Sequence, residues 1–149
     1  MELPDAAAAH PRMVAVWDAL LQLGGGMMPD RRGVDPVELP LEALPWLFLI
    51  DVWPDRAVFR LAGTEIVAST GRELKGVPLD GLVSGTAFDD AWVQIRQTID
   101  DNRAVYADRR VESTNGRTLS FHRLLIPLKP LNPEFRTIIG VTVSTKPAT

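Results

Sequence analysis

The strongest constraint on the fold is a hairpin signal near the end of the chain. Asn115-Gly116 lies between two segments in which apolar and polar side chains alternate, residues 103–113 and 117–128. An Asn-Gly pair favours the tight turn that joins antiparallel strands, because both positions accept a positive φ. A third alternating segment follows at residues 135–144. These segments predict an antiparallel sheet rather than a parallel one.

Two more strands are predicted earlier in the chain. Residues 46–52 form a continuous apolar run, which is typical of a strand buried on both faces. Pro54-Asp55 is a turn signal, and residues 57–61 alternate as the hairpin partner. Four prolines between residues 29 and 45 exclude a long helix or a central strand before this hairpin.

An amphipathic helix is predicted before the first strand. It begins near Pro11 and ends at the glycines of residues 24–26, and its apolar positions Met13, Trp17 and Leu20 share one face. This apolar face requires a cover, which we expect to be the outer face of the sheet in the same chain or in a partner subunit.

Three helices are predicted between the two groups of strands. The second of two short helices is expected to open at the capping box Thr70-x-x-Glu73 and to close at Gly76. A longer helix is expected to begin near Thr86, where Thr86-x-x-Asp89 forms a second capping box. Helices between groups of strands predict an α+β domain, with helices on one face of a five-stranded antiparallel sheet. We expect the first strand to be central in this sheet and paired with the last.

Composition limits the classes of function. The chain of 149 residues has room for a single globular unit, which we divide into an N-terminal helix and cap (1–26) and the domain proper (27–149). A net charge of −3 argues against nucleic acid as a partner. Without a signal peptide or a long apolar run, we expect a cytoplasmic protein that does not enter the membrane.

The order of elements, together with three short segments, resembles the PAS domain family. These segments are residues 59–64, residues 69–76 and residues 122–128. The similarity is greatest to small single-domain bacterial PAS proteins with an N-terminal helix. It implies a five-stranded sheet and helices around a cavity, often for a small ligand. It also implies a sensory role, a homodimer formed through the outer sheet face or the N-terminal helix, and output through a separate signalling protein.

The resemblance also implies which side chains enter the cavity. Flavin-binding PAS domains have the same interval between a hairpin glycine and a strand proline as Gly116 and Pro127 here, and transfer of their pattern turns Arg109, Phe121, Arg123 and Thr142 inward. Arg109 and Arg123 are then expected to lie about opposite each other, so an anionic group of a ligand would compensate them. The alternatives are internal pairing with carboxylates of the covering helices, Glu65, Asp89 or Asp90, and extension of the guanidinium tips to the rim of the cavity.

Aromatic and interface residues complete the candidate sites. Trp92 is a candidate to stack on a planar ligand, although an aromatic residue at helical spacing is also an ordinary core residue. Met13, Trp17 and Leu20 are the candidate interface residues. Side chains alternate between the two faces along a strand, so the same pattern places His122 on the outward face, where we expect a packing or surface role.

Catalysis and known cofactors receive little support. The chain has no cysteine and only two histidines, His10 and His122, which excludes a cysteinyl photoadduct and gives no catalytic motif. We expect no enzyme and no metal site, and the sequence identifies no cofactor. Two functions remain: a sensor that binds an anionic or planar metabolite, and a ligand-free dimerisation or adaptor module. A cone-shaped α+β fold of the NTF2-like kind is a distant third class.

Overall fold

The computed structural model describes residues 1–112 and 118–145, and only the backbone of residues 109–112, 118–120 and 145. The predicted Asn115-Gly116 turn lies outside this part of the chain. Among the described residues, no helix combines the length and apolar character needed to cross a bilayer.

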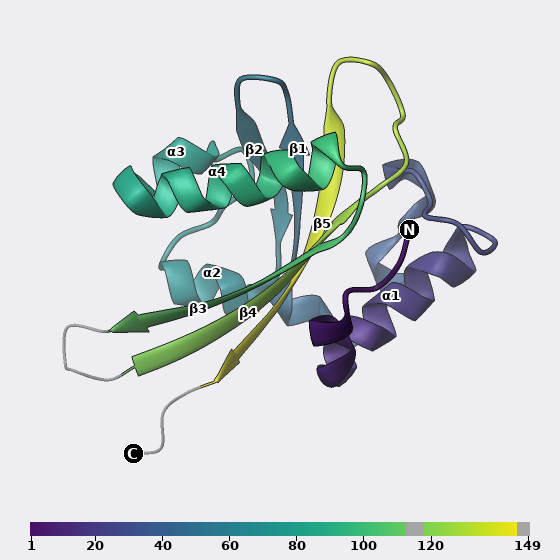
Figure 1. Cartoon of the computed structure of the whole chain (residues 1–149), viewed down its shortest axis with the longest axis horizontal. Coiled ribbons are helices and arrows are strands. Elements are labelled where there is room, and N and C mark those ends of the chain that lie inside the picture. The colour runs from purple at the N-terminus through teal and green to yellow at the C-terminus, as the bar shows by residue number, and fades with distance from the viewer. Residues whose placement is uncertain (113–117, 146–149) are drawn as a thin grey trace.

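Five strands form one antiparallel sheet in the order β2-β1-β5-β4-β3 (Figure 1). The strands are β1 (Leu47–Val52), β2 (Ala57–Ala62), β3 (Val105–Glu112), β4 (Thr118–Pro127) and β5 (Arg136–Thr145). The α-helices are α1 (Pro11–Leu23), α2 (Thr64–Thr70), α3 (Leu79–Leu82) and α4 (Gly85–Asp100), and the 3-10 helices are η1 (Asp5–Ala9), η2 (Arg31–Gly33), η3 (Pro36–Glu38) and η4 (Leu44–Trp46). The predicted α+β fold and the pairing of β1 with β5 are confirmed. β5, not β1, is the middle strand.

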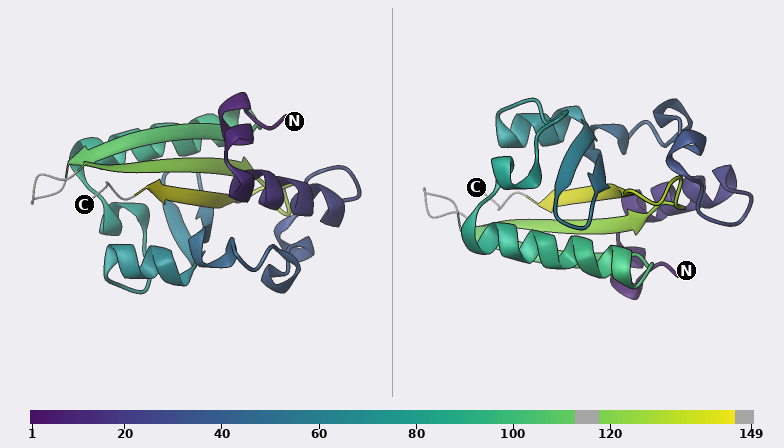
Figure 2. Two further views of the ribbon diagram at one scale, coloured as in Figure 1. Left: turned by 90° about the horizontal axis from the view of Figure 1, so that it is seen from below. Right: turned by 90° about the horizontal axis from the view of Figure 1, so that it is seen from above.

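The helices cover the two faces of the sheet unequally. Figure 2 shows α1 on one face and α4 on the other. We call the face under α4 the inner face, and α2 and α3 also pack on its core. We call the other the outer face, and α1 packs there with the apolar side chains of β4 and β5. The chain therefore covers its outer face with its own N-terminal helix.

Both predicted capping boxes are wrong. Thr70 ends α2, and Gly71 follows in the left-handed conformation that closes a helix. α4 begins at Gly85 with Ser84 at the N-cap, where no side chain caps the helix. The carboxylate of Glu73 accepts from the backbone N–H of Leu74 and Lys75, so it caps a turn. A Thr-x-x-Glu pattern serves a local turn as readily as a helix start.

β2 contains a β-bulge. Ile50 pairs with Phe59 and Leu49 pairs with Leu61, so Arg60 is an additional residue in β2. A bulge places two successive side chains on one side of the sheet. Arg60 and Leu61 therefore both lie on the outer face, where Arg60 contacts Asp51.

Gly140 of β5 allows the ring of Phe48 to cross the inner face. Gly140 pairs with Phe48, and a Cβ at this glycine would overlap three carbons of the Phe48 ring. The ring also makes an edge contact with Phe59, with a centroid distance of 5.7 Å. The absence of a side chain at residue 140 therefore decides how the core around Phe48 packs.

Candidate functional site

A cavity of about 220 Å³ lies between the inner face of the sheet and helices α2 to α4. Its walls are mostly apolar, and Phe48 and Phe59 contribute two aromatic rings. Ala87 and Ala91 of α4, one helical turn apart, face the cavity with methyl side chains. Small side chains at these positions leave space that a larger residue would fill.

Three of the residues predicted from the sequence lie together at this cavity. Phe121, Arg123 and Thr142 all line it, and Arg123 is the cross-strand partner of Thr142. Ser69 and Thr70 from α2 bring two hydroxyl groups, which the sequence interpretation did not identify. An apolar cavity with a few polar groups is the usual form of a small-molecule site.

The predicted register of the two arginines is wrong by two residues. Arg123 pairs with Ala107, and Arg109 pairs with Phe121. The residue opposite Arg123 is therefore two positions before Arg109 in β3. A shift of two residues preserves the face, so Arg109 and Arg123 are diagonal neighbours on the inner face. The side chain of Arg109 lies outside the described part of the structure.

Trp92 lies beside the cavity and is not among the described residues that line it. Its ring stacks on Phe88 at a centroid distance of 6.3 Å, and the guanidinium of Arg96 lies 5.9 Å from the ring centroid. Ala91, its neighbour on α4, takes the position facing the cavity. Adjacent residues of a helix point about 100° apart, which explains the difference.

The candidate interface residues are buried within the chain itself. Met13 and Leu20 have no exposed surface and Trp17 retains 6%, in a core shared with the outer face of the sheet. Arg12 links this helix to the cavity wall, because its Nη1 donates to the carbonyl oxygen of Thr142 at 2.8 Å. The side chain of Thr142 lines the cavity while its carbonyl group holds α1.

Both histidines of the chain meet its single tyrosine on the outer face. Hydrogen bonds join the Tyr106 hydroxyl to His122 Nδ1 at 2.6 Å and to His10 Nε2 at 3.2 Å. Burial, and then the charge of His122, lower the pKa of His10. Burial, and then the charge of Asp108, raise the pKa of Tyr106. The predicted outward orientation of His122 agrees with this structure, but its contact with His10 required the position of α1.

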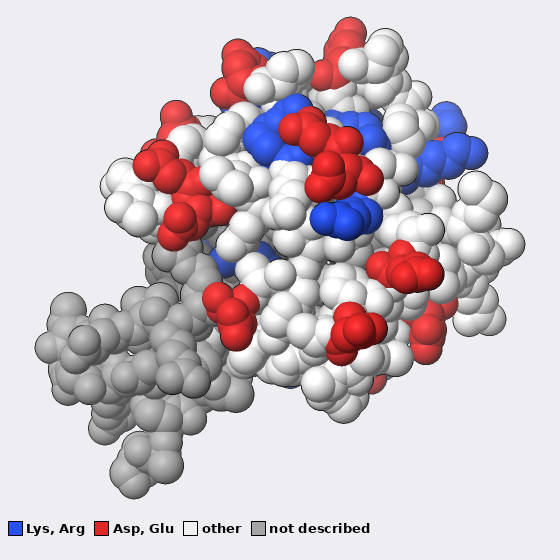
Figure 3. Space-filling view, in the orientation of Figure 1, with Lys and Arg blue, Asp and Glu red and all other residues white. Residues whose placement is uncertain are grey.

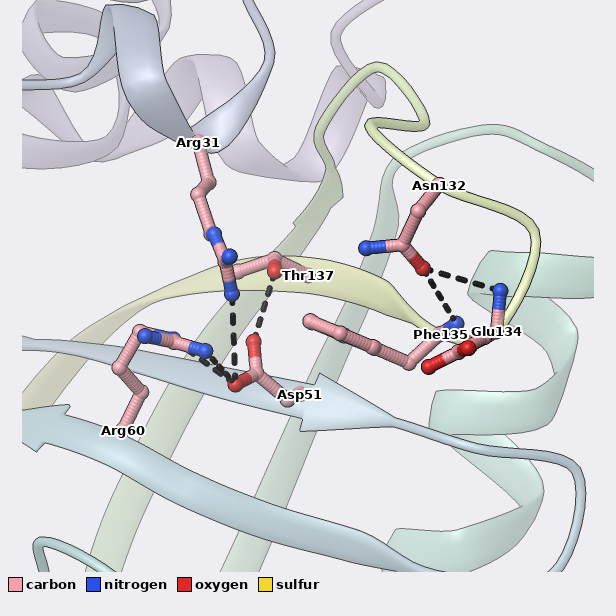
Figure 4. A network of polar contacts seen from close by, with 7 residues as sticks. All are labelled: Arg31, Asp51, Arg60, Asn132, Glu134, Phe135 and Thr137. Carbon is pink, nitrogen blue, oxygen red and sulfur yellow. Dashed lines mark hydrogen bonds and ion pairs between the residues drawn. The ribbon is translucent and has the colours of Figure 1, made fainter.

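A buried carboxylate on the outer face forms a second polar cluster (Figure 4). Asp51 is 4% exposed, accepts from Thr137 Oγ1 at 2.7 Å and accepts from Arg60 Nε at 2.8 Å. Arg31 Nη1 lies 3.9 Å from the same carboxylate, and its guanidinium lies 5.0 Å from the ring centroid of Phe135. We call Arg31, Asp51, Arg60 and Thr137 the ionic cluster. Sequence interpretation did not identify it, because Asp51 stood within an apolar run.

Among the residues that the structure describes, no group of three His, Asp or Glu side chains could hold a metal ion. On the face drawn in Figure 3, acidic and basic side chains are interspersed, in keeping with the small net charge.

Known structures share this fold at low sequence identity. The photo-excited blue-light photoreceptor Vivid superimposes with a TM-score of 0.52 and 20% identity, covering 86% of this chain and 93% of Vivid. A fungal LOV domain photoreceptor, described together with a pathway that integrates blue light and oxidative stress, gives a TM-score of 0.53 and 19% identity, covering 93% of this chain and 97% of its own. No curated protein sequence matches the chain.

The sequence itself carries the family assignment. A model of the PAS domain matches residues 6–143, which include α1, helices α2 to α4 and most of β5. The resemblance noted at residues 59–64, 69–76 and 122–128 is therefore part of a match over almost the entire chain. The chain belongs to the PAS domain family.

Proposed function

We propose that this PAS domain is a sensory module that binds a small anionic or planar metabolite in its inner cavity and acts on a separate signalling protein. The observation that supports the proposal is the combination of Arg123, Thr142 and two α2 hydroxyl groups in an otherwise apolar cavity. Apolar walls provide affinity, and a few polar groups orient the ligand.

The size of the cavity favours a compact ligand. A volume of about 220 Å³ lies below the range of about 300–1,000 Å³ typical of sites for drug-sized molecules. Arg123 has an interaction partner within the chain, so an anion would share the guanidinium with that partner or displace it. A guanidinium group suits a carboxylate or phosphate because its donors match two oxygens.

The contact between Arg12 and Thr142 provides a route from the cavity to the surface. A ligand that moves the side chain of Thr142 also shifts the carbonyl group that accepts from Arg12 of α1. Docking of α1 would then respond to the ligand, and the uncovered outer face would be offered to a partner or to a second copy in a homodimer. Such a coupling requires that the ligand bind one state of α1 better than the other.

The experiment begins with native mass spectrometry of freshly purified protein, compared with its denatured mass. We expect an added mass that the denatured protein lacks, and its identification provides the ligand for titration. Arg123→Met should weaken binding of that ligand by about tenfold to a hundredfold, because a charge-assisted hydrogen bond is lost while the apolar stem is kept. Arg103→Met is the matched control, since its side chain is 63% exposed and lies outside the cavity.

The alternative is a ligand-free dimerisation or adaptor module. The small cavity and the internal partner of Arg123 favour it. A stable dimer whose native mass equals twice the mass of one chain, with no added ligand, would support this alternative against the sensor. Arg123→Met should then have no effect on that dimer.

A further inference from the structure

A second cavity lies on the outer face, beyond the area that α1 covers. Its floor is formed by Leu47 and Leu49 of β1, Leu61 of β2 and Ile139 of β5, and its wall by the proline-rich residues 34–45. We call this space the outer groove. Its volume is about 430 Å³, which exceeds that of the inner cavity and lies within the usual range for small-molecule sites.

The outer groove is apolar and accessible. Leu41 on its wall is 77% exposed and Leu61 on its floor is 41% exposed. Single exposed leucines are common on protein surfaces. Large apolar side chains that remain exposed together around a concave surface are instead typical of a binding site. The groove therefore offers contact area to an aliphatic group.

The floor of the groove ends at the ionic cluster. Asp51 follows Leu49 on the outer face of β1, and its partner Thr137 precedes Ile139 on β5. Residues two apart in a strand share a face and are separated by about 7 Å. On β2 the bulge places Arg60 beside Leu61 on this same face. Three strands thus change from apolar to polar side chains at the same end of the groove.

The wall makes the same change. Val34 lines the groove, and Arg31 lies three residues earlier, at the start of η2. Figure 4 shows Arg31 reaching down toward Asp51 from η2, whereas Arg60 approaches the same carboxylate from β2 at the left of the view. Neither arginine is among the described residues that line the groove, so an occupant must extend past Leu49 and Ile139 to reach the two guanidinium groups.

The ionic cluster has an excess of positive charge and an unused donor. Two guanidinium groups face one carboxylate, and Arg60 and Thr137 already donate to its two oxygens. Arg31 Nη1 is 3.9 Å from Asp51, which is beyond hydrogen-bond distance, and it is a buried nitrogen without a hydrogen-bond partner in the described structure. A second anionic group would provide the missing acceptor and balance the charge.

We propose that the outer groove binds a free monoalkyl carboxylate, a medium-chain fatty acid. Its alkyl chain packs on Leu47, Leu49, Leu61 and Ile139, and its carboxylate accepts from Arg31 Nη1 beside Arg60. Charge complementarity selects this occupant over a neutral or cationic amphiphile. This site is separate from the inner cavity, from which the sheet divides it.

Isothermal titration calorimetry tests the proposal with dodecanoate below its micellar concentration and dodecyltrimethylammonium as the charge-reversed probe. We expect saturable binding of dodecanoate to one site and at least tenfold weaker binding of the cation. Arg31→Gln should weaken dodecanoate binding by about tenfold, the loss expected for a charge-assisted hydrogen bond. Arg32→Gln is the matched control, because the neighbouring Arg32 side chain is 74% exposed and should leave binding unchanged.

Leu41→Asp gives a second test that does not depend on the ionic cluster. The side chain is exposed, so the fold should persist, while a carboxylate at the wall should repel the ligand and reduce its affinity at least tenfold. Methyl NMR locates the ligand: shifts at Leu61 and Ile139 support the outer groove, whereas shifts confined to Ile66 and Leu82 place it in the inner cavity and overturn the proposal. Equal binding of both probes also overturns the proposal. So does a dimer in solution that Leu41→Asp dissociates and that dodecanoate leaves unchanged.

Discussion

Substitution of Gly140 by alanine should destabilise the protein through a single contact. The added Cβ would lie 2.6 Å from Cε2 of Phe48 and closer still to two other ring carbons. Carbon atoms pack at about 3.5–4.0 Å, so the ring must withdraw by about 1 Å or more. Overpacking of this kind costs about 1–3 kcal/mol of the free energy of unfolding. For a chain of this length that corresponds to a decrease in Tm of about 3–10 °C.

A double-mutant cycle with Phe48→Leu tests the stated cause. Leucine lacks the ring carbons that the new Cβ would overlap, so alanine at residue 140 should no longer be harmful. It should instead raise the free energy of unfolding by roughly 0.5 kcal/mol, because glycine loses more conformational freedom than alanine on folding.

Urea denaturation of the four proteins measures the cycle, with equal m-values as the control for two-state unfolding. The expected result is a change of sign: Gly140→Ala destabilises the protein with Phe48 and stabilises it with leucine. If the two substitutions are additive within about 0.5 kcal/mol, the contact with Phe48 does not explain the glycine.

Three further perturbations test other parts of the structure. Asp51→Asn should cost roughly 1.5–3 kcal/mol in urea unfolding, because two arginines lose a buried carboxylate, whereas Asp55→Asn in the exposed pair with Arg56 should change stability by less than about 0.5 kcal/mol; equal effects would contradict this difference. Burial and the charge of His122 lower the pKa of His10 below its usual 6.5, so stability is complete above pH 6.5 and falls as the pH drops from there toward the lowered pKa. The decrease in Tm between about pH 7.5 and pH 5.5 should therefore be smaller in His10→Gln, and an unchanged decrease would show that His10 is not responsible. Deletion of residues 1–26 should uncover the outer face and cause aggregation or altered self-association in light scattering, and an unchanged mass with unchanged melting would exclude a covering role for α1.

The alternation of side chains along strands made the inner cavity predictable. Once the resemblance fixed one face of β4, parity placed Phe121, Arg123 and Thr142 together, and the structure agrees. A shift of two residues returns a side chain to the same face of the strand. The faces were therefore predicted correctly while the pairing of Arg109 with Arg123 was wrong.

The outer groove could not be predicted in the same way. Its wall consists of residues 34–45, which have no periodic pattern because prolines interrupt them. Its ionic cluster joins residues from η2, β1, β2 and β5, so no local motif contains it. The contact of His10 with His122 is likewise a property of where α1 docks and not of any sequence spacing.

The additional residue in β2 also affects how related sequences are to be aligned. Removal of Arg60 alone would let Leu61 and Ala62 keep their partners Leu49 and Phe48 in a regular ladder. Deletion of the one codon for Arg60 would therefore convert this strand into an unbulged one, with the loss of that arginine alone. An ungapped alignment would compare residues 57–59 or residues 61–62 with positions on the opposite face. A gap opened at residue 60 keeps both halves of the strand in frame, and its presence in relatives would show which of them lack this arginine.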